Sequence, residues 1–220
     1  MRITFDHQIF SSQRTGGISR YFCNIIKHLK NDPDLTVNLP IQNYDNVYLQ
    51  EMENVLNIRN AKKGYFDFLK KSNNPNYHIS KEFLESQNFD ILHATYYDDY
   101  FVNWVKKKPF VITIHDMIHE KFPELFSLKD NTAKLKKDLA LKSDKIIVVS
   151  ESTKKDLLEF VDIDDTKIDV IPLASSFSIN QEAPHHERGK YLLYVGSRSI
   201  YKNFYFMLSS IKELLRDTKD

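Results

Sequence analysis

An unbroken run of four β-branched residues, Ile-Ile-Val-Val at positions 146–149, constrains the fold of this chain more than any other feature. Such a run is typical of a central strand in a parallel sheet that helices cover on both faces. Related apolar segments predict strands over residues 2–6, 35–39, 89–93, 110–114, 145–149, 168–171 and 191–195. Segments of helical periodicity separate them. The sequence therefore predicts an α/β fold with a doubly wound, mainly parallel, Rossmann-like sheet.

The domain organisation follows from a break in this rhythm after residue 171. Pro172, Pro184 and Gly189 lie in a polar stretch that resembles a hinge. We expect a Rossmann-like domain over residues 1–175, an interdomain hinge over 176–189, and the first strand and helix of an incomplete second domain over 190–220. One strand and one helix cannot form a core, so the last segment either packs on the first domain or belongs to a truncated one.

Composition excludes several classes of function. With 31 Lys and Arg residues against 30 Asp and Glu residues, the chain has no broad basic face for nucleic acid. The single cysteine, Cys23, lies in a helical pattern and is expected to be buried packing in a cytoplasmic protein. No apolar run approaches the ~20 residues of a membrane span.

Glycine placement points to anion binding. Two of the five glycines, Gly16 and Gly17, separate the first predicted strand from the first amphipathic helix, and Gly196 repeats this arrangement before the helix predicted over residues 203–216. A glycine pair before a helix lets backbone N–H groups approach a phosphate. The dinucleotide fingerprint is absent, so NAD binding is not expected.

Polar residues follow most of the predicted strands, where parallel sheets bind ligands. They are Asp6, His7, His93, Thr95, Tyr96, Tyr97, His115, Asp116, Ser150 and Glu151. Each residue alone also fits a strand end satisfied by the backbone or a helix cap, and Ser150 is interpreted mainly as a cap. The set as a whole predicts one functional rim.

Charged residues allow further readings. Arg198 and Lys202 flank a predicted helix start, where the dipole disfavours cations, so they predict a nearby anion; two solvated side chains are the alternative. His115, His119 and His93 could be read as metal ligands, but no cysteine cluster supports a metal site, and none is expected. The lysine runs 106–108 and 134–137 are interpreted as exposed faces, with a weak peripheral membrane contact left open.

An ordered series of motifs resembles the amino-terminal domain of a family 4 glycosyltransferase, most like its mannosyltransferase-type members. The motifs are Gly-Gly-Ile-Ser-Arg-Tyr at 16–21, Ile-Leu-His-Ala-Thr-Tyr-Tyr at 91–97, Thr-Ile-His-Asp at 113–116 running to Phe-Pro-Glu at 122–124, the segment 142–152, Val-Ile-Pro-Leu-Ala at 170–174, and the segment 194–203. Together they cover nearly all of the chain.

The resemblance implies a GT-B architecture of two Rossmann-like domains and a retaining transfer of sugar from a nucleotide-diphosphate-sugar to a glycan or lipid-linked glycan in polysaccharide assembly. No metal or other cofactor is implied. By this similarity Gly16 and Gly17 lie against the donor, and His115 lies beside the transferred sugar as the catalytic candidate. Arg198 and Lys202 neutralise the leaving diphosphate, while Tyr96 and Tyr97 line the acceptor side.

Two departures qualify the resemblance. Ser197 separates Gly196 from Arg198, where many members of the family have the arginine directly after the glycine. The paired-glutamate segment that grips the donor would lie beyond Asp220. We therefore expect that the 220-residue chain alone transfers no sugar at a useful rate. A noncatalytic glycan- or protein-binding module, and a half-enzyme completed by a partner chain, stay open as alternatives.

Overall fold

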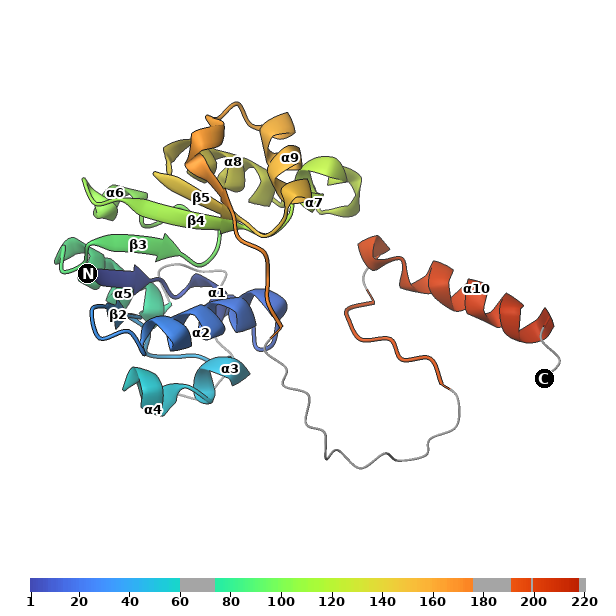
Figure 1. The fold of residues 1–220 in the computed structure, drawn as a ribbon, viewed down its shortest axis with the longest axis horizontal. Coiled ribbons are helices and arrows are strands. Elements are labelled where there is room, and N and C mark those ends of the chain that lie inside the picture. The colour runs from blue at the N-terminus through green and yellow to red at the C-terminus, as the bar shows by residue number, and fades with distance from the viewer. Residues whose placement is uncertain (60–73, 176–190, 199, 218–220) are drawn as a thin grey trace.

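The computed structural model describes residues 1–59, 74–175, 191–198 and 200–217 of the chain. Its centre is a six-stranded, all-parallel sheet with the strand order β2-β1-β3-β4-β5-β6. The strands are β1 (Arg2–Phe5), β2 (Thr36–Asn38), β3 (Ile91–Ala94), β4 (Phe110–Ile114), β5 (Lys145–Val148) and β6 (Ile168–Val170). The predicted doubly wound α/β sheet is confirmed (Figure 1).

Helices connect the strands, as a parallel sheet requires. They are α1 (Gln8–Ser12), α2 (Gly17–Leu29), α3 (Val47–Gln50), α4 (Glu53–Leu56), α5 (Pro75–Glu85), α6 (Val102–Val105), α7 (Ile118–Lys121), α8 (Thr132–Lys142), α9 (Glu151–Phe160) and α10 (Phe204–Asp217), with short 3-10 turns η2 (Pro123–Leu125), η3 (Asp165–Lys167) and η4 (Ile200–Lys202). The sequence did not reveal α1, which is a single short helix between β1 and the glycine pair.

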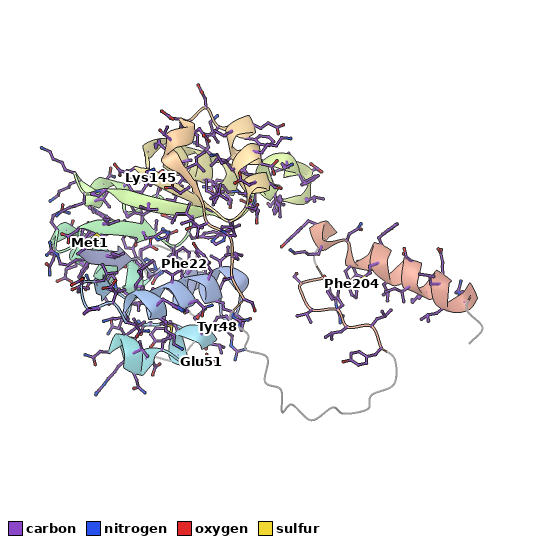
Figure 2. All side chains as sticks on the ribbon, in the orientation of Figure 1. Met1, Phe22, Tyr48, Glu51, Lys145 and Phe204 are labelled. Carbon is purple, nitrogen blue, oxygen red and sulfur yellow. The ribbon has the colours of Figure 1, made fainter. Side chains whose placement is uncertain are left out.

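The core of the described residues consists of two apolar clusters. The first joins β1 and β2 to α2 through Phe5, Val37, Phe22 and Ile26, and it contains the expected buried Cys23. Figure 2 labels Phe22 on α2. The second lies around β3, β4 and β5 and includes residues of α5, α8 and α9. Burial of these side chains is the main source of stability for a sheet of this kind.

The strand order reverses between β1 and β3. The chain runs from β1 outward to β2 and then crosses to the other side of β1 to form β3. At such a reversal the two connections leave the carboxyl ends of neighbouring strands in opposite directions, which opens a crevice for ligands. The loops after β1 and β3 are therefore the first place to look for a site.

The strand expected over residues 191–195 does not form. These residues are irregular, and Leu192, Leu193 and Val195 are 74%, 75% and 84% exposed. A strand requires a neighbour for its backbone hydrogen bonds, and in the described part of the chain this segment has none. The following helix, α10, is close to the one predicted over 203–216. The hinge expected over 176–189 lies outside the described residues.

Candidate active site

The amino end of α2 forms the first part of the candidate active site. Gly16 is its N-cap, Gly17 is its first residue, and its first turn carries no acidic side chain, so the helix dipole favours an anionic ligand. A Cβ on the exposed Gly17 would meet nothing within 4 Å. At Gly16 a Cβ would collide with the carboxamide of Gln13, which accepts a hydrogen bond from the Ser19 N–H at 3.3 Å. Gly17 thus leaves space for a ligand at this helix end.

His115 forms the second part, directly after β4. Its ring meets the ring of Tyr21, from the second turn of α2, edge-on with centroids 5.1 Å apart. Phe22 packs against the same imidazole at 6.2 Å. The Tyr21 contact joins the glycine end of α2 to the carboxyl end of β4, so the glycine pair and the predicted catalytic histidine belong to one rim of the sheet.

The imidazole of His115 is neutral at physiological pH. Burial is the main reason that its pKa falls to about 4, and the nearby Lys136 ammonium lowers it further while Asp116 opposes the shift. Its Nε2 atom is buried and has no hydrogen-bond partner among the described residues. A buried polar atom without a partner is costly. A bound hydroxyl group would supply the partner of Nε2.

His93, which the sequence placed with the polar rim, is instead a core residue. It is 7% exposed, its ring packs on Phe5 and Phe22, and its Nε2 lies 2.9 Å from the Thr113 hydroxyl. Burial lowers the pKa of His93 to about 3. The Thr113 hydroxyl also lies 3.5 Å from the Tyr21 hydroxyl. His93 therefore supports the layer beneath His115 and does not face a ligand.

The two neighbouring tyrosines have different positions. Tyr97 is 6% exposed, donates its hydroxyl to the Thr113 carbonyl at 3.2 Å and accepts the His115 N–H at 3.3 Å, so it braces the loop that carries His115. Tyr96 is half-buried and lines a cavity beside β1. Nothing in the adjacent letters of the sequence distinguishes the two roles.

A buried lysine was missed by the sequence reasoning. Lys136 was expected on an exposed face, but it is 1% exposed, so that prediction is wrong. Its ammonium group donates to the Asp116 carbonyl at 2.9 Å and to the Glu120 carboxylate at 3.0 Å, and it lies over the Tyr97 ring. The only sequence signal is that Lys136 shares a helix face with Leu139 and Ala140, which are both buried. Lys136 anchors the segment that follows His115.

Arg198 and Lys202 contact aromatic rings of their own segment. The Arg198 guanidinium lies 5.0 Å from the Phe204 ring centre, and the Lys202 ammonium lies 5.1 Å from that of Tyr201. Gly196 has a φ of 152°, a conformation that favours glycine. These contacts leave the donor-binding role of Arg198 and Lys202 a prediction.

Ser150 caps helix α9. Its hydroxyl accepts the Thr153 N–H at 3.1 Å, which confirms its interpretation as the cap.

Across the described residues, no group of three or more His, Cys, Asp or Glu side chains is arranged to hold a metal ion. Within the same part of the chain, no helix is both long and apolar enough to cross a bilayer.

The fold and this rim define a Rossmann-like domain with polar side chains at the carboxyl ends of its strands. The model of Glycosyltransferase Family 4 matches residues 15–174, and the chain therefore belongs to that family. Among curated proteins, no sequence matches the chain.

Solved structures similar to the chain include HepE from Anabaena and a UDP-GlcNAc 2-epimerase from Neisseria meningitidis. HepE from Anabaena, in complex with UDP and glucose, gives a TM-score of 0.50 at 15% identity over 78% of this chain and 44% of HepE. The UDP-GlcNAc 2-epimerase from Neisseria meningitidis, bound to UDP-GlcNAc, gives a TM-score of 0.49 at 14% identity over 77% of this chain and 46% of the epimerase. The chain thus spans less than half the length of either protein, and the likeness to HepE supports the GT-B type of fold.

Proposed function

We propose that this chain is the acceptor-side domain of a GT-B glycosyltransferase that moves a sugar from a nucleotide-diphosphate-sugar to a glycan or lipid-linked glycan, with retention of configuration. Membership of Glycosyltransferase Family 4 supports sugar transfer as the reaction. HepE, whose fold is similar, is in complex with UDP and glucose, which supports a nucleotide-sugar as the donor. A mannosyltransferase-type specificity is part of the proposal.

The observation that carries the proposal is the unpaired Nε2 of a neutral His115 on the same rim as the open end of α2. A neutral imidazole can form a hydrogen bond with a hydroxyl of the transferred sugar without placing a positive charge beside it. The N–H groups at Gly17 suit the donor diphosphate. Arg198 and Lys202 are proposed to neutralise the charge that develops on the leaving group, which is usually a large contribution to catalysis.

Turnover is proposed to need a second domain, in keeping with the 44% of HepE that the chain spans. The experiment therefore compares this chain alone with a polypeptide in which a nucleotide-binding domain follows it. Both are incubated with radiolabelled UDP-glucose, UDP-N-acetylglucosamine or GDP-mannose and with free and lipid-linked oligosaccharides. Labelled product is expected from the longer polypeptide only, and NMR of its anomeric proton reports whether configuration is retained.

Two variants make this test specific. His115→Ala is expected to lower kcat by roughly 100-fold or more, the scale of a lost proton-transfer or positioning group. His28→Ala removes an exposed histidine of α2 and is expected to leave kcat unchanged. Full activity of His115→Ala would overturn the assignment. Glycan binding without any transfer by the longer polypeptide would favour the noncatalytic module instead.

A half-enzyme completed by a partner chain is favoured by a separate observation. Large apolar side chains of residues 191–217 are exposed, among them Leu192, Leu193, Val195, Phe206 and Leu214. Exposed apolar surface of this extent marks an interface. Light scattering of the chain at increasing concentration, alone and in a mixture with candidate partners, distinguishes a monomer from a complex of fixed stoichiometry.

A further inference from the structure

The strand β4 continues beyond the end of its neighbour β3. The last residue of β3, Ala94, lies opposite Ile112, whereas β4 runs on to the residue before His115. After Ala94 the chain turns to the end of β1, where the Thr95 N–H donates to the Asp6 carboxylate at 2.9 Å. β4 thus carries His115 past the end of β3.

The register of this ladder shows which backbone groups a longer β3 would have bonded. Leu92 lies opposite Phe110, and its N–H donates to the Pro109 carbonyl at 3.1 Å. In a parallel pair such a residue also accepts the N–H from the other side of its partner, and the pattern repeats at every second residue. Two repeats further along, β3 would have bonded the Thr113 carbonyl and the His115 N–H.

The side chain of Tyr97 takes the place of that further residue. Its hydroxyl donates to the Thr113 carbonyl at 3.2 Å and accepts the His115 N–H at 3.3 Å. One hydroxyl can serve both groups because it is a donor and an acceptor at once. Burial raises the pKa of the Tyr97 phenol well above its ordinary value, so the hydroxyl keeps the proton that it donates. A side chain thus completes the ladder as far as His115.

The ring that carries this hydroxyl is itself held in place. Tyr97 is 6% exposed and belongs to the apolar cluster around β3, β4 and β5. The Lys136 ammonium lies 5.3 Å from the centre of the Tyr97 ring, an attractive arrangement, and it also donates to the Asp116 carbonyl at 2.9 Å. The ring of Tyr96 packs against that of Tyr97 with centroids 4.7 Å apart. The Tyr97 hydroxyl therefore has little freedom to move.

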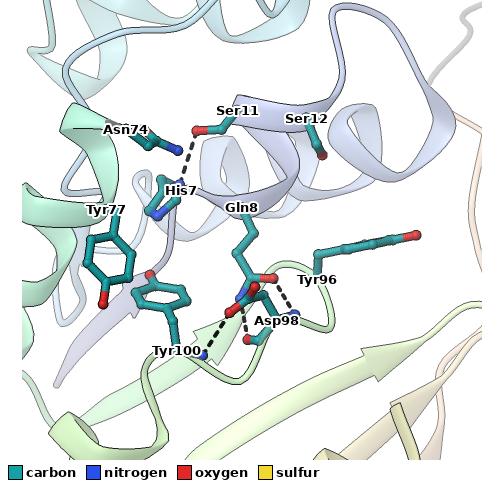
Figure 3. Close-up of a pocket in the computed structure, with 9 residues that line it drawn as sticks. All are labelled: His7, Gln8, Ser11, Ser12, Asn74, Tyr77, Tyr96, Asp98 and Tyr100. Carbon is teal, nitrogen blue, oxygen red and sulfur yellow. Dashed lines mark hydrogen bonds between the residues drawn. The ribbon is translucent and has the colours of Figure 1, made fainter. Parts of the chain in front are cut away.

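The adjacent Tyr96 takes a different direction. Figure 3 shows it lining a cavity together with His7 and Tyr100, and Tyr97 is not among the described residues that line this cavity. The Tyr97 hydroxyl instead bonds the backbone on both sides of Ile114. Of the two neighbours, Tyr97 is thus the one directed at the end of β4.

The place of the His115 imidazole depends on the backbone that carries it. Its Nε2 has no hydrogen-bond partner among the described residues, so no such bond anchors this atom of the ring. Tyr21 and Phe22 support the imidazole by ring packing, with centroids 5.1 and 6.2 Å away. The hydrogen bond from the His115 N–H to Tyr97 adds a directional contact. Such contacts matter, since misplacing a reacting group by about 1 Å can cost about 100-fold in rate.

We propose that Tyr97 is a positioning residue for His115: its hydroxyl replaces a further residue of β3 and fixes the end of β4, which leaves β3 free to turn toward β1. The inference rests on the proposed function in so far as His115 acts in sugar transfer. The placement of His115 by Tyr97 needs no turnover. It gives Tyr97 a role other than the acceptor contact expected from the sequence.

The first test uses NMR of the 220-residue chain and needs no substrate. In the unaltered chain, a nuclear Overhauser contact is expected between the ring protons of Tyr97 and the amide proton of His115. In Tyr97→Phe the His115 amide loses its acceptor and should exchange with solvent at least about tenfold faster, while the Ile112 amide inside β4 should keep its rate. An absent contact, an unchanged His115 amide, or equal acceleration of both amides would overturn the proposal.

The second test uses the longer polypeptide, in which a nucleotide-binding domain follows the chain. Tyr97→Phe is expected to lower kcat at least about tenfold and to change the KM of donor and acceptor less than about twofold, because it acts through His115 and not on a substrate. Tyr48→Phe removes a phenol hydroxyl from α3, beside the other apolar cluster, and should change neither constant. A higher KM for the acceptor with an unchanged kcat would return Tyr97 to the acceptor side.

A double variant separates positioning from a general effect on the fold. If Tyr97 acts through His115, adding Tyr97→Phe to His115→Ala should lower the remaining kcat by less than about twofold. A further tenfold loss in the double variant would show that Tyr97 acts independently of His115 and would end the proposal.

The two proposals fail in different ways. Faster exchange confined to the His115 amide in Tyr97→Phe, with no transfer by the longer polypeptide, would end the proposed function and keep the placement of His115 by Tyr97. Transfer with a kcat that Tyr97→Phe does not change would keep the enzyme and end the role of Tyr97.

Discussion

The ring of Tyr21 meets the imidazole of His115 edge-on, with an interplanar angle of 89° and centroids 5.1 Å apart. This contact joins the glycine-led helix α2 to the carboxyl end of β4. It also covers the imidazole, and cover of this kind is the main cause of the low pKa of His115.

Replacing Tyr21 is expected to change the titration of His115. Tyr21→Ala uncovers the imidazole, so the pKa of His115 should rise from about 4 toward its ordinary 6.5. Tyr21→Phe keeps the ring and removes only the distant hydroxyl contact with Thr113, so the pKa should stay low. Histidine ring NMR over a pH series measures both. A pKa that stays near 4 in Tyr21→Ala would show that Tyr21 does not shield His115.

Alanine substitutions at the two glycines separate an effect on ligand binding from an effect on stability. Gly17→Ala places a methyl group in open space, so the free energy of unfolding should change by less than about 1 kcal/mol, while affinity for UDP or GDP should fall if the phosphates approach this helix end. Gly16→Ala pushes the Gln13 carboxamide away from Ser19 and should lower stability instead. Calorimetric titration and urea unfolding measure the two effects. Unchanged nucleotide affinity in Gly17→Ala would argue against a donor at this position.

Lys136 should be important for stability despite its charge. Lys136→Met leaves the Glu120 carboxylate, whose side chain is 9% exposed, without its cation, and loss of one partner of a buried pair costs about 3–5 kcal/mol. The double variant Lys136→Met/Glu120→Gln should recover part of that loss. The neighbouring exposed Lys137 provides the control, since Lys137→Met should change the free energy of unfolding by about 0.5 kcal/mol or less. Equal effects at Lys136 and Lys137 in urea unfolding would contradict the buried pair.

Three histidines with lowered pKa values predict a steep loss of stability in acid. The pKa values of His7, His93 and His115 fall to about 4, 3 and 4 from an ordinary 6.5, so the unfolded chain binds more protons than the folded one between pH 6.5 and about 4. The free energy of unfolding should therefore fall through this window as pH decreases, by about 1.4 kcal/mol per pH unit for each histidine. Asp6, whose pKa is raised mainly by burial, acts in the opposite direction at the acid end.

Removing one of these histidines should flatten the pH dependence. His93→Phe is expected to reduce the slope by about a third, while His28→Phe, at an exposed position, should leave it unchanged. Urea unfolding at a series of pH values provides the slopes. A slope in His93→Phe equal to that of the unaltered chain would mean that His93 is not buried as a neutral ring.

The sheet was predictable because its strands carry their own signal. Continuous apolar runs need burial on both faces, and β4 was predicted with the bounds that the structure has. The segment 191–195 carries the same signal and forms no strand, because strand formation depends on a neighbour that the local sequence does not specify.

The sequence predicted that the candidate residues share one rim of the sheet, but it did not predict the contacts that each of them makes. Glycines before a helix and polar residues after strands pointed to the rim that holds Gly17 and His115. The sequence could not show that His93 turns into the core, that Lys136 is buried against Glu120, or that Tyr96 rather than Tyr97 lines a cavity. Each of these depends on partners distant in the chain, whose approach is set by packing rather than by local pattern.

The position of β1 inside the sheet has a practical consequence. Among the described residues β2 pairs with β1 alone, and β1 lies between β2 and β3, so the first few residues hold together two parts of the sheet that lie far apart in sequence. Arg2 adds to this link through its ion pair with Asp90. Trimming the chain at its amino end to improve expression or crystals would therefore separate β2 and α2 from the remaining strands.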